Sequence, residues 1–353
     1  MKISRIIALI ILAGVCLTGT AQTPRFELDR DWPQLPLGER WLTGGLGGLC
    51  ISPDDHVFLL NRQNVVAEDL DAARLAPPII ELNADGEVVR GWGDPELIGG
   101  RLHDCYADKE SLWLVAAATG YVQKWARDGS ELLMQIGEPG AYDSDDGTRR
   151  GRPLNSDNPR FFLPAAIDVD SDSGEIYVAD GELPGGNSRI AVLSPSGEFL
   201  RQWRLVRSEE ETGVIELPHC LRLADDGLVY VCDRRADRIQ VFNRQGELLQ
   251  QIPVKFEPQT SPAGRSSGGR GTAVVLDFSN DPEQRYLYVI NQNSVAVEIL
   301  DRRSGAVQGR VGFGPGRYPG QFELPHGIAV DSQGNIYVAE QEGRRVQRFL
   351  RID

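Results

Sequence analysis

The sequence predicts an all-β protein, a six-bladed β-propeller with four-stranded blades, and three observations support this fold class. One strand–turn–strand unit recurs six times along the 353 residues, at intervals of 53 to 62 residues. Turn formers are plentiful, with 39 Gly and 21 Pro. Almost no stretch shows helical periodicity, which makes an α/β alternative poor.

The repeats are clearest where they begin with proline, at Pro164, Pro218 and Pro325. Each contains a short apolar strand, a polar turn and a strand rich in Val, Ile and Tyr, and turns such as RDGS, PSGE and RQGE separate the later strands. Each interval therefore holds four short strands. The equivalent first-strand positions are Gly47, His103, Ala165, His219, Thr272 and His326.

The two ends of the chain are predicted to complete one blade together. The sixth repeat stops at FLRID after its third strand, while RFELDRDW, residues 25–32, precedes the first repeat and has no blade of its own. We expect this N-terminal stretch to supply the missing outer strand and leave no open sheet edge. The long polar loops 138–160 and 254–270 are expected on the surface, where loops commonly carry function.

The first 21 residues have the order of a secretory signal: Lys2 and Arg5, an apolar run, then small residues ending at Ala21. Cleavage after Ala21 leaves residues 22–353 as a single propeller domain, secreted or periplasmic. Lipidation at Cys16 is the less favoured alternative, because Val15 fits such a site poorly.

The charge and the apolar run limit the possible partners. A net charge of −14 argues against nucleic-acid binding, which needs basic residues to neutralise phosphates. The N-terminal apolar run is too short to span a membrane comfortably. We expect a monomer that acts on a small molecule or peptide.

Four cysteines remain in the expected mature chain: Cys50, Cys105, Cys220 and Cys232. An oxidising compartment permits disulfides, and four cysteines allow three complete pairings that the sequence cannot decide. The alternative is that some are small buried hydrophobes.

Three of the four histidines fall at one repeat position. His103, His219 and His326 occupy it in blades two, four and six, so rotation of the blades places them about 120° apart around the axis. Three neutral imidazoles suit zinc or a related divalent ion and leave a fourth position open. The alternative is that each imidazole is structural and bonded to a carbonyl. His56, in the turn PDDHV, lies off this ring and is interpreted as a solvated turn residue.

The repeats resemble NHL-type six-bladed propellers, and their order resembles the catalytic domain of peptidyl-α-hydroxyglycine α-amidating lyase. The resemblance is densest over DGELPGGNSRIAVLSPSGEFLRQW, LPHCLRLADDGLVYVCDRRADRIQVF and residues 321–349. It implies a zinc ion held by the three ring histidines, with Arg62 in LLNRQN and Arg234 in CDRRADRI binding the substrate carboxylate. The implied reaction cleaves a carbinolamide, such as a peptidyl-α-hydroxyglycine, to an amide and glyoxylate.

The sequence departs from the family pattern at two positions. The family has a catalytic tyrosine after an Asp-Gly pair, but here Glu182 follows Asp180 and Gly181. Glu182 could be a general base, a bystander in a surface loop, or a fourth metal ligand. The family also has an Asp after its third zinc histidine that helps to bind calcium. Gly327 stands there instead, so Ca²⁺ is less expected than Zn²⁺.

Other interpretations remain open. An Asp does follow the first ring histidine, at Asp104, rather than the third. Arg234 could form an ordinary salt bridge, with Asp233 as one partner. The chain as a whole could be a non-catalytic NHL-type binding propeller. A calcium-dependent lactonase fits poorly, because calcium prefers oxygen ligands to imidazole.

Overall fold

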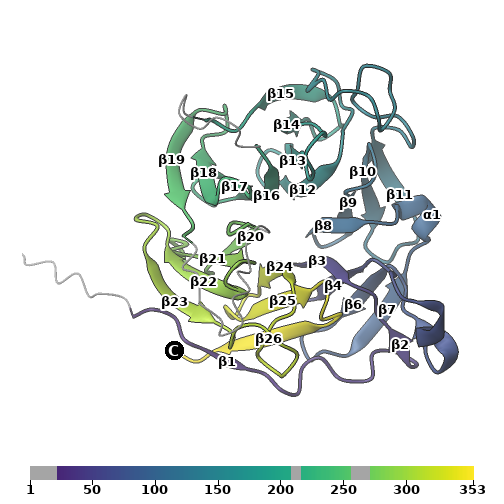
Figure 1. The fold of residues 1–353 in the computed structure, drawn as a ribbon, viewed down its shortest axis with the longest axis vertical. Coiled ribbons are helices and arrows are strands. Elements are labelled where there is room, and N and C mark those ends of the chain that lie inside the picture. Colours follow the sequence, from purple (N-terminus) through teal and green to yellow (C-terminus); the bar gives the residue numbers. More distant parts are fainter. Residues whose placement is uncertain (1–21, 208–215, 256–270) are drawn as a thin grey trace, which may run out of the picture.

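The computed structural model describes residues 22–207, 216–255 and 271–353. Within these residues the chain is all-β, and six four-stranded antiparallel sheets surround a central axis (Figure 1). We call each sheet a blade and number the blades along the chain. The predicted signal peptide and most of the predicted loop 254–270 lie outside the described residues.

The first three blades follow one another directly in the sequence. Blade one contains β3 (Leu46–Ile51), β4 (Val57–Asn61), β6 (Ile79–Leu82) and β7 (Val88–Trp92). Blade two contains β8 (Leu102–Ala107), β9 (Ser111–Ala116), β10 (Val122–Ala126) and β11 (Leu132–Ile136). Blade three contains β12 (Pro164–Val169), β13 (Ile176–Asp180), β14 (Arg189–Leu193) and β15 (Phe199–Trp203).

The last three blades complete the ring. Blade four contains β16 (Pro218–Leu223), β17 (Val229–Asp233), β18 (Arg238–Phe242) and β19 (Leu248–Pro253). Blade five contains β20 (Val275–Phe278), β21 (Tyr286–Asn291), β22 (Ala296–Asp301) and β23 (Val307–Val311). Blade six contains β24 (Pro325–Val330), β25 (Ile336–Glu340), β26 (Val346–Arg351) and β1 (Phe26–Leu28).

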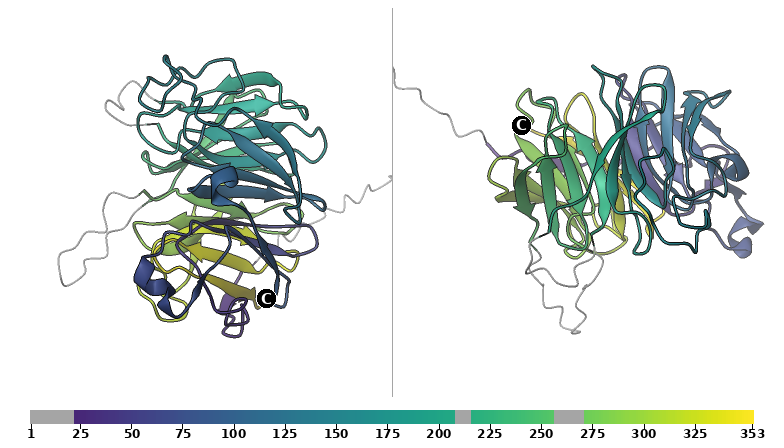
Figure 2. Two further views of the ribbon diagram at one scale, coloured as in Figure 1. Left: turned by 90° about the vertical axis from the view of Figure 1, so that its right-hand side faces the viewer. Right: turned by 90° about the horizontal axis from the view of Figure 1, so that it is seen from above.

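Four short elements lie outside the six blades. Strands β2 (Trp41–Leu42) and β5 (Arg74–Leu75) form a parallel pair. A 3₁₀ turn spans Ala67–Asp71, and α1 spans Pro95–Ile98. The side views in Figure 2 show the blades around the flattened ring, with α1 on its outside. Among the described residues, no helix is long and apolar enough to cross a membrane.

The N-terminal strand closes the ring, as the sequence predicts. Strand β1 pairs antiparallel with β26, with Phe26 opposite Arg351 and Leu28 opposite Phe349. Beyond β1 the chain crosses toward blade one, and Trp32 packs into the core between the last blade and the first. Its ring contacts Tyr337 edge to face, with centroids 4.8 Å apart.

The structure decides the cysteine pairing that the sequence left open. Cys50 and Cys105 form a disulfide that links the inner strands of blades one and two. Cys220 and Cys232 form a disulfide between directly opposed residues of β16 and β17. For these four residues, the alternative of free buried thiols is therefore wrong.

Candidate metal centre

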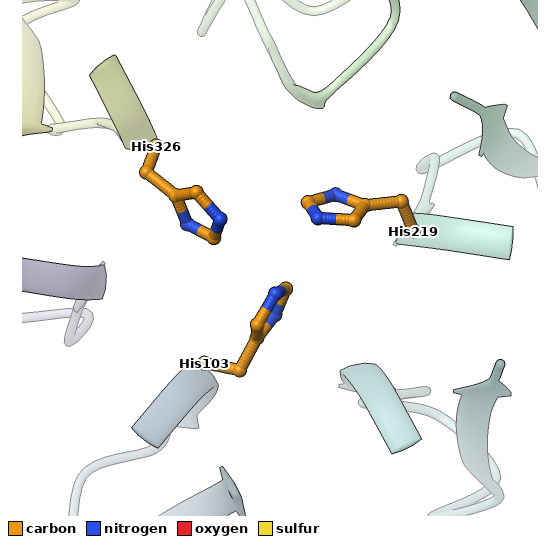
Figure 3. A group of neighbouring side chains, drawn as sticks. All are labelled: His103, His219 and His326. Atoms are coloured by element: carbon orange, nitrogen blue, oxygen red, sulfur yellow. The ribbon is translucent and has the colours of Figure 1, made fainter. Parts of the chain in front are cut away.

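Three histidine rings meet on the axis of the propeller (Figure 3). His103, His219 and His326 are each the second residue of an inner strand, in β8, β16 and β24, and all three are buried. The ring centroid of His103 lies 4.8 Å from each of the other two, which are 5.4 Å apart. One ring nitrogen from each lies within 4.8 Å of the others. The structure thus brings together the three residues that the repeat alignment selected.

Each imidazole is oriented by a carbonyl of the next blade around the ring. The three hydrogen bonds join Nδ1 of His103 to Ala165 O (2.7 Å), Nδ1 of His219 to Val274 O (2.7 Å), and Nδ1 of His326 to Gly47 O (2.8 Å). A carbonyl oxygen only accepts, so Nδ1 carries the proton and Nε2 keeps a lone pair when the ring is neutral. A hydrogen bond from Nδ1 to a carbonyl and a bond from Nε2 to a metal are therefore compatible in the same imidazole.

These hydrogen bonds also correct the repeat alignment in blade five. Val274, not Thr272, stands where Ala165 and Gly47 stand in their blades. Thr272 lies before β20, where its hydroxyl donates to Asp237. The chain therefore enters the inner strand of blade five two residues later than the sequence suggests.

The surroundings keep the three imidazoles neutral. Burial is the main cause that lowers the pKa of each one well below the usual value of histidine. Positive charge adds to this effect: Arg62 and Arg101 lower the pKa of His103, and Arg234 lowers the pKa of His219. Neutral rings are the form that binds a metal.

The donor set fits a bound metal ion. Nε2 of His103 is buried and has no hydrogen-bond partner, a rare condition for a polar atom inside a protein. Three imidazole nitrogens are a ligand set of catalytic zinc sites, which keep a further position open for water or substrate. His103, His219 and His326 are therefore the residues that could hold such an ion.

Glu182 lies beside this cluster and is buried. It follows β13, and its side chain is 1% exposed. Its Oε1 lies 3.4 Å from Nε2 of His103 and accepts from Nη2 of Arg101 at 2.6 Å, while Oε2 is buried without a hydrogen-bond partner. Glu182 does not lie in a surface loop, because its side chain is buried and paired with Arg101. The general-base and ligand interpretations remain.

Arg101 is the site residue that the sequence reasoning missed. It precedes β8, and its guanidinium holds Glu182 across 81 positions of sequence. The only signal in the sequence was the nearness of Arg101 to His103, two residues away. Its partner could not have been identified this way.

Arg62 lies directly after β4, against the start of β8. Its Nε donates to the carbonyl of Leu102 at 2.9 Å, and its Nη2 is buried without a hydrogen-bond partner. Burial and repulsion from Arg101 lower its pKa to about 10, so it stays protonated at neutral pH. Gly47 makes room for this packing, because a Cβ there would lie 2.6 Å from Nε of Arg62.

Arg234 lies directly after β17 and reaches the histidine cluster. Its Nη1 is 3.0 Å from Nε2 of His219, and its Nη2 donates to Gln292 at 3.0 Å. Asp233, the salt-bridge partner that the sequence offered, instead accepts from Nε of Arg238 at 3.0 Å. Arg234 therefore has one contact with the histidine cluster, through His219.

A second set of charged groups lies along the axis beyond the histidines. Asp104 forms two hydrogen bonds with Arg222, at 2.9 and 3.0 Å. Burial raises the pKa values of Asp168 and Asp277, the carboxyl groups on either side of Arg222, to about 6. Asp104, the acidic residue that follows the first ring histidine, is thus engaged by a guanidinium.

His56 is not the solvated turn residue that the sequence suggested. Its Nδ1 lies 2.7 Å from Oε1 of Glu81, a buried carboxylate that also accepts from Arg127. The partner lies on β6 of the same blade, and Arg127 of blade two adds a charge from the neighbouring blade.

Comparisons with known proteins agree with the repeats. The model of the NHL repeat matches residues 217–242 and 322–349. Peptidyl-alpha-hydroxyglycine alpha-amidating lyase 1 of Drosophila melanogaster is 28% identical over 284 residues, covering 76% of this chain and 47% of the fly protein. The chain therefore carries NHL repeats and is homologous, at modest identity, to amidating lyases.

Two other relatives differ in what their names describe. Peptidyl-glycine alpha-amidating monooxygenase B of Xenopus laevis is 27% identical over 93% of this chain, which spans 36% of the length of that relative. NHL repeat-containing protein 3 of Mus musculus is 28% identical over 93% of this chain and 85% of its own length. A solved structure of virginiamycin B lyase from Staphylococcus aureus superposes with a TM-score of 0.56 and 15% identity, covering 93% of this chain and all of the other, a likeness of fold alone.

Proposed function

We propose that this NHL-repeat propeller, like the amidating lyases to which it is homologous, is an exported zinc-dependent lyase. Its substrate is an N-acyl-α-hydroxyglycine, a carbinolamide, which it cleaves to an amide and glyoxylate. The observation that carries this proposal is the meeting of three neutral imidazoles beside two arginine side chains, Arg62 and Arg234. When bound by the three histidines, zinc supplies Lewis acidity that lowers the pKa of an oxygen it contacts.

The arginines provide the binding of the substrate carboxylate. Arg62 and Arg234 project from blades one and four, and both lower the pKa of His103 and His326, so their charges act at the same place. Nη2 of Arg62 has a donor to offer, because it has no hydrogen-bond partner in the protein. Guanidinium groups bind carboxylates with paired N–H donors, so the two arginines orient the substrate through its glyoxylate portion.

Glu182 provides the proton transfer. Arg101 engages Oε1, the oxygen that lies 3.4 Å from Nε2 of His103, and Oε2 is buried without a hydrogen-bond partner. In the reaction, Glu182 accepts the hydroxyl proton, the C–N bond breaks as the C=O bond of glyoxylate forms, and the proton passes to the departing amide nitrogen. One O–H and one C–N bond are lost, and one C=O π bond and one N–H bond are gained, so atoms and charge balance.

The test combines metal analysis with a direct product assay. Purified protein is expected to contain about one zinc per chain and to release glyoxylate from N-acetyl-α-hydroxyglycine above the uncatalysed rate. His219→Ala is expected to lose both the metal and the activity. Protein that retains its metal unchanged in this variant, or wild-type zinc protein that releases no glyoxylate, would contradict the proposal.

A non-catalytic binding propeller is the second candidate, favoured by the similarity to NHL repeat-containing protein 3 over most of that protein's length. The two candidates differ in their dependence on the axial histidines. A variant with all three histidines changed to alanine should lose a lyase activity, but it should keep a partner that binds to the outer surface of the blades.

A further inference from the structure

The Nε2 atom of His219 accepts a hydrogen bond from Arg234. Nδ1 of His219 lies 2.7 Å from the carbonyl oxygen of Val274, which can only accept, so Nδ1 carries the single proton of the neutral ring. Nε2 therefore presents a lone pair, and Nη1 of Arg234 donates to it across 3.0 Å. The corresponding Nε2 of His103 has no hydrogen-bond partner. The three-histidine cluster is thus asymmetric, because a guanidinium engages one lone pair and leaves another without a partner.

The lone pair that Arg234 engages is the one that a metal ion would need. The Nδ1 atoms of all three ring histidines are bonded to carbonyls, so Nε2 is the atom that each imidazole can offer as a ligand. One lone pair accepts either an N–H group or a metal bond. A guanidinium has only donors and cannot itself be a ligand, and its positive charge repels a cation. Arg234 and a metal ion therefore exclude one another at Nε2 of His219.

Gln292 holds Arg234 in this position. It directly follows β21 and is 3% exposed. Its Oε1 accepts from Nη2 of Arg234 at 3.0 Å, and its Nε2 donates to the carbonyl of Pro325 at 2.9 Å. Pro325 directly precedes His326, so Gln292 connects the guanidinium to a blade that carries a second ring histidine. The contact between Arg234 and His219 is therefore fixed by a buried and anchored neighbour.

A substrate carboxylate offers Arg234 a different partner. A carboxylate is a stronger acceptor for a guanidinium than a neutral imidazole is, because it carries the opposite charge and can accept two parallel N–H bonds. Arg234 is only partly buried, so its guanidinium is accessible to a ligand at the site. A carboxylate that takes Arg234 from His219 leaves the lone pair of Nε2 to the metal. Such coupling is reciprocal, so a bound metal favours the carboxylate by the same factor.

We propose that Arg234 competes with the metal ion for Nε2 of His219, and that a carboxylate ligand raises the affinity of the site for zinc by displacing Arg234. The inference rests on the proposed function and adds its regulation: the site binds zinc most tightly when a substrate carboxylate is present. Arg234 thus couples the two ligands of one site, in addition to holding one of them.

The first test measures zinc affinity by competition with a coloured chelator. Arg234→Met removes the guanidinium and is expected to bind zinc about ten-fold more tightly than wild type, because the metal no longer displaces a charge-assisted hydrogen bond. Arg62→Met is the matched control. Arg62 also lowers the pKa values of His103 and His326 by its charge, but its Nε donates to the carbonyl of Leu102. The control should raise zinc affinity clearly less, and equal rises in both variants would overturn the competition.

The second test adds a carboxylate that is not cleaved. N-acetylglycine has the carboxylate of the substrate without its hydroxyl group, and N-acetylglycinamide is the matched compound without the charge. Saturating N-acetylglycine is expected to raise the zinc affinity of wild type about five-fold, and the amide is expected to leave it unchanged. Arg234→Met should show no response to either compound. A rise that persists in this variant would mean that the carboxylate acts without Arg234, and it would refute the coupling.

Both measurements are independent of turnover, which separates this inference from the lyase function. If wild-type protein binds zinc and releases glyoxylate but Arg234→Met has the same zinc affinity, the competition fails and the lyase function stands. If Arg234→Met binds zinc more tightly while no variant releases glyoxylate, the competition stands and the lyase function fails. Wild-type protein that binds no zinc would refute both.

Discussion

Glu182 and Arg101 show how one ion pair can set the chemistry of a site. The 2.6 Å contact fixes one carboxylate oxygen, and the 3.4 Å approach to His103 places the carboxylate at the edge of the imidazole cluster. The other oxygen is buried without a partner, which is costly unless a ligand or solvent satisfies it. A tyrosine at this position could not form the same ion pair with Arg101.

Glu182→Gln distinguishes the two remaining roles of this residue. If Glu182 is the general base, the variant should keep its zinc content while kcat falls about 100-fold, which is a typical contribution of general base catalysis. Metal content and kcat are both measured on the purified variant. Loss of the zinc together with the activity would instead make Glu182 a metal ligand.

Asp277 gives the protein a pH dependence of stability that does not involve the histidines. Burial raises its pKa to about 6, above the value of about 3.9 in an unfolded chain. Its contribution to stability is therefore complete below pH 4 and is lost as the pH rises through 6. Asp277→Asn should remove this loss, so its free energy of unfolding relative to wild type should rise by about 3 kcal/mol between pH 4 and pH 8. Urea unfolding at both pH values measures the change. The same difference in free energy of unfolding between the two proteins at both pH values would contradict it.

At the scale of the elements, the inner strands β8, β16 and β24 bring the three histidines together. The second residue of β8, β16 and β24 faces the axis in each case, and the carbonyl of the next blade fixes the ring. The geometry of the site therefore depends on the contact of each inner strand with its neighbour. A shift of one strand by a single residue would turn its histidine to the other face.

The N-terminal strand is the element on which ring closure depends. Trp32 is 4% exposed and fills the core between blades six and one. Trp32→Ala should therefore lower the free energy of unfolding by about 3–5 kcal/mol, as other large-to-small core changes do. Leu200→Ala, at an exposed position of the outer strand of blade three, is the control and should change stability by less than about 1 kcal/mol. Equal effects of the two changes would show that the interface between blades six and one is not tightly packed.

At the scale of the whole molecule, the axial site connects alternate blades. A metal held by His103, His219 and His326 would join blades two, four and six, which share no strand pairing with one another in the part of the chain that the structure describes. The disulfide Cys50–Cys105 adds a covalent link between blades one and two. A metal ion bound by the three histidines would therefore stabilise the ring that positions them.

Chelation tests this coupling directly. Zinc present at about a thousand times its Kd stabilises the folded state by about 4 kcal/mol, so removal of the metal should lower Tm measurably. The variant with all three histidines changed to glutamine is the control, because its Tm should be insensitive to the chelator. A wild-type Tm that does not respond to chelation would argue against a metal at this site.

The repeat pattern alone determined the architecture and the ring of histidines. A propeller repeats one local unit by rotation, so residues at the same place in the unit lie at the same depth along the axis. The position shared by His103, His219 and His326 could therefore be found from the sequence alone. The closing role of residues 25–32 followed from counting strands. The alignment at Thr272 was wrong because Thr272 lies before β20, where its hydroxyl donates to Asp237 of blade four, a contact 35 residues away in the sequence.

The tertiary structure decided which side chains meet between blades. Glu182 and Arg101 are 81 residues apart, Arg222 and Asp104 are 118 apart, and no local pattern pairs them. The burial of Glu182, the charged partner of His56 and the two disulfides were likewise settled by packing between strands. Such pairings depend on which side chains approach one another in three dimensions, and a repeat period describes only how often each strand returns.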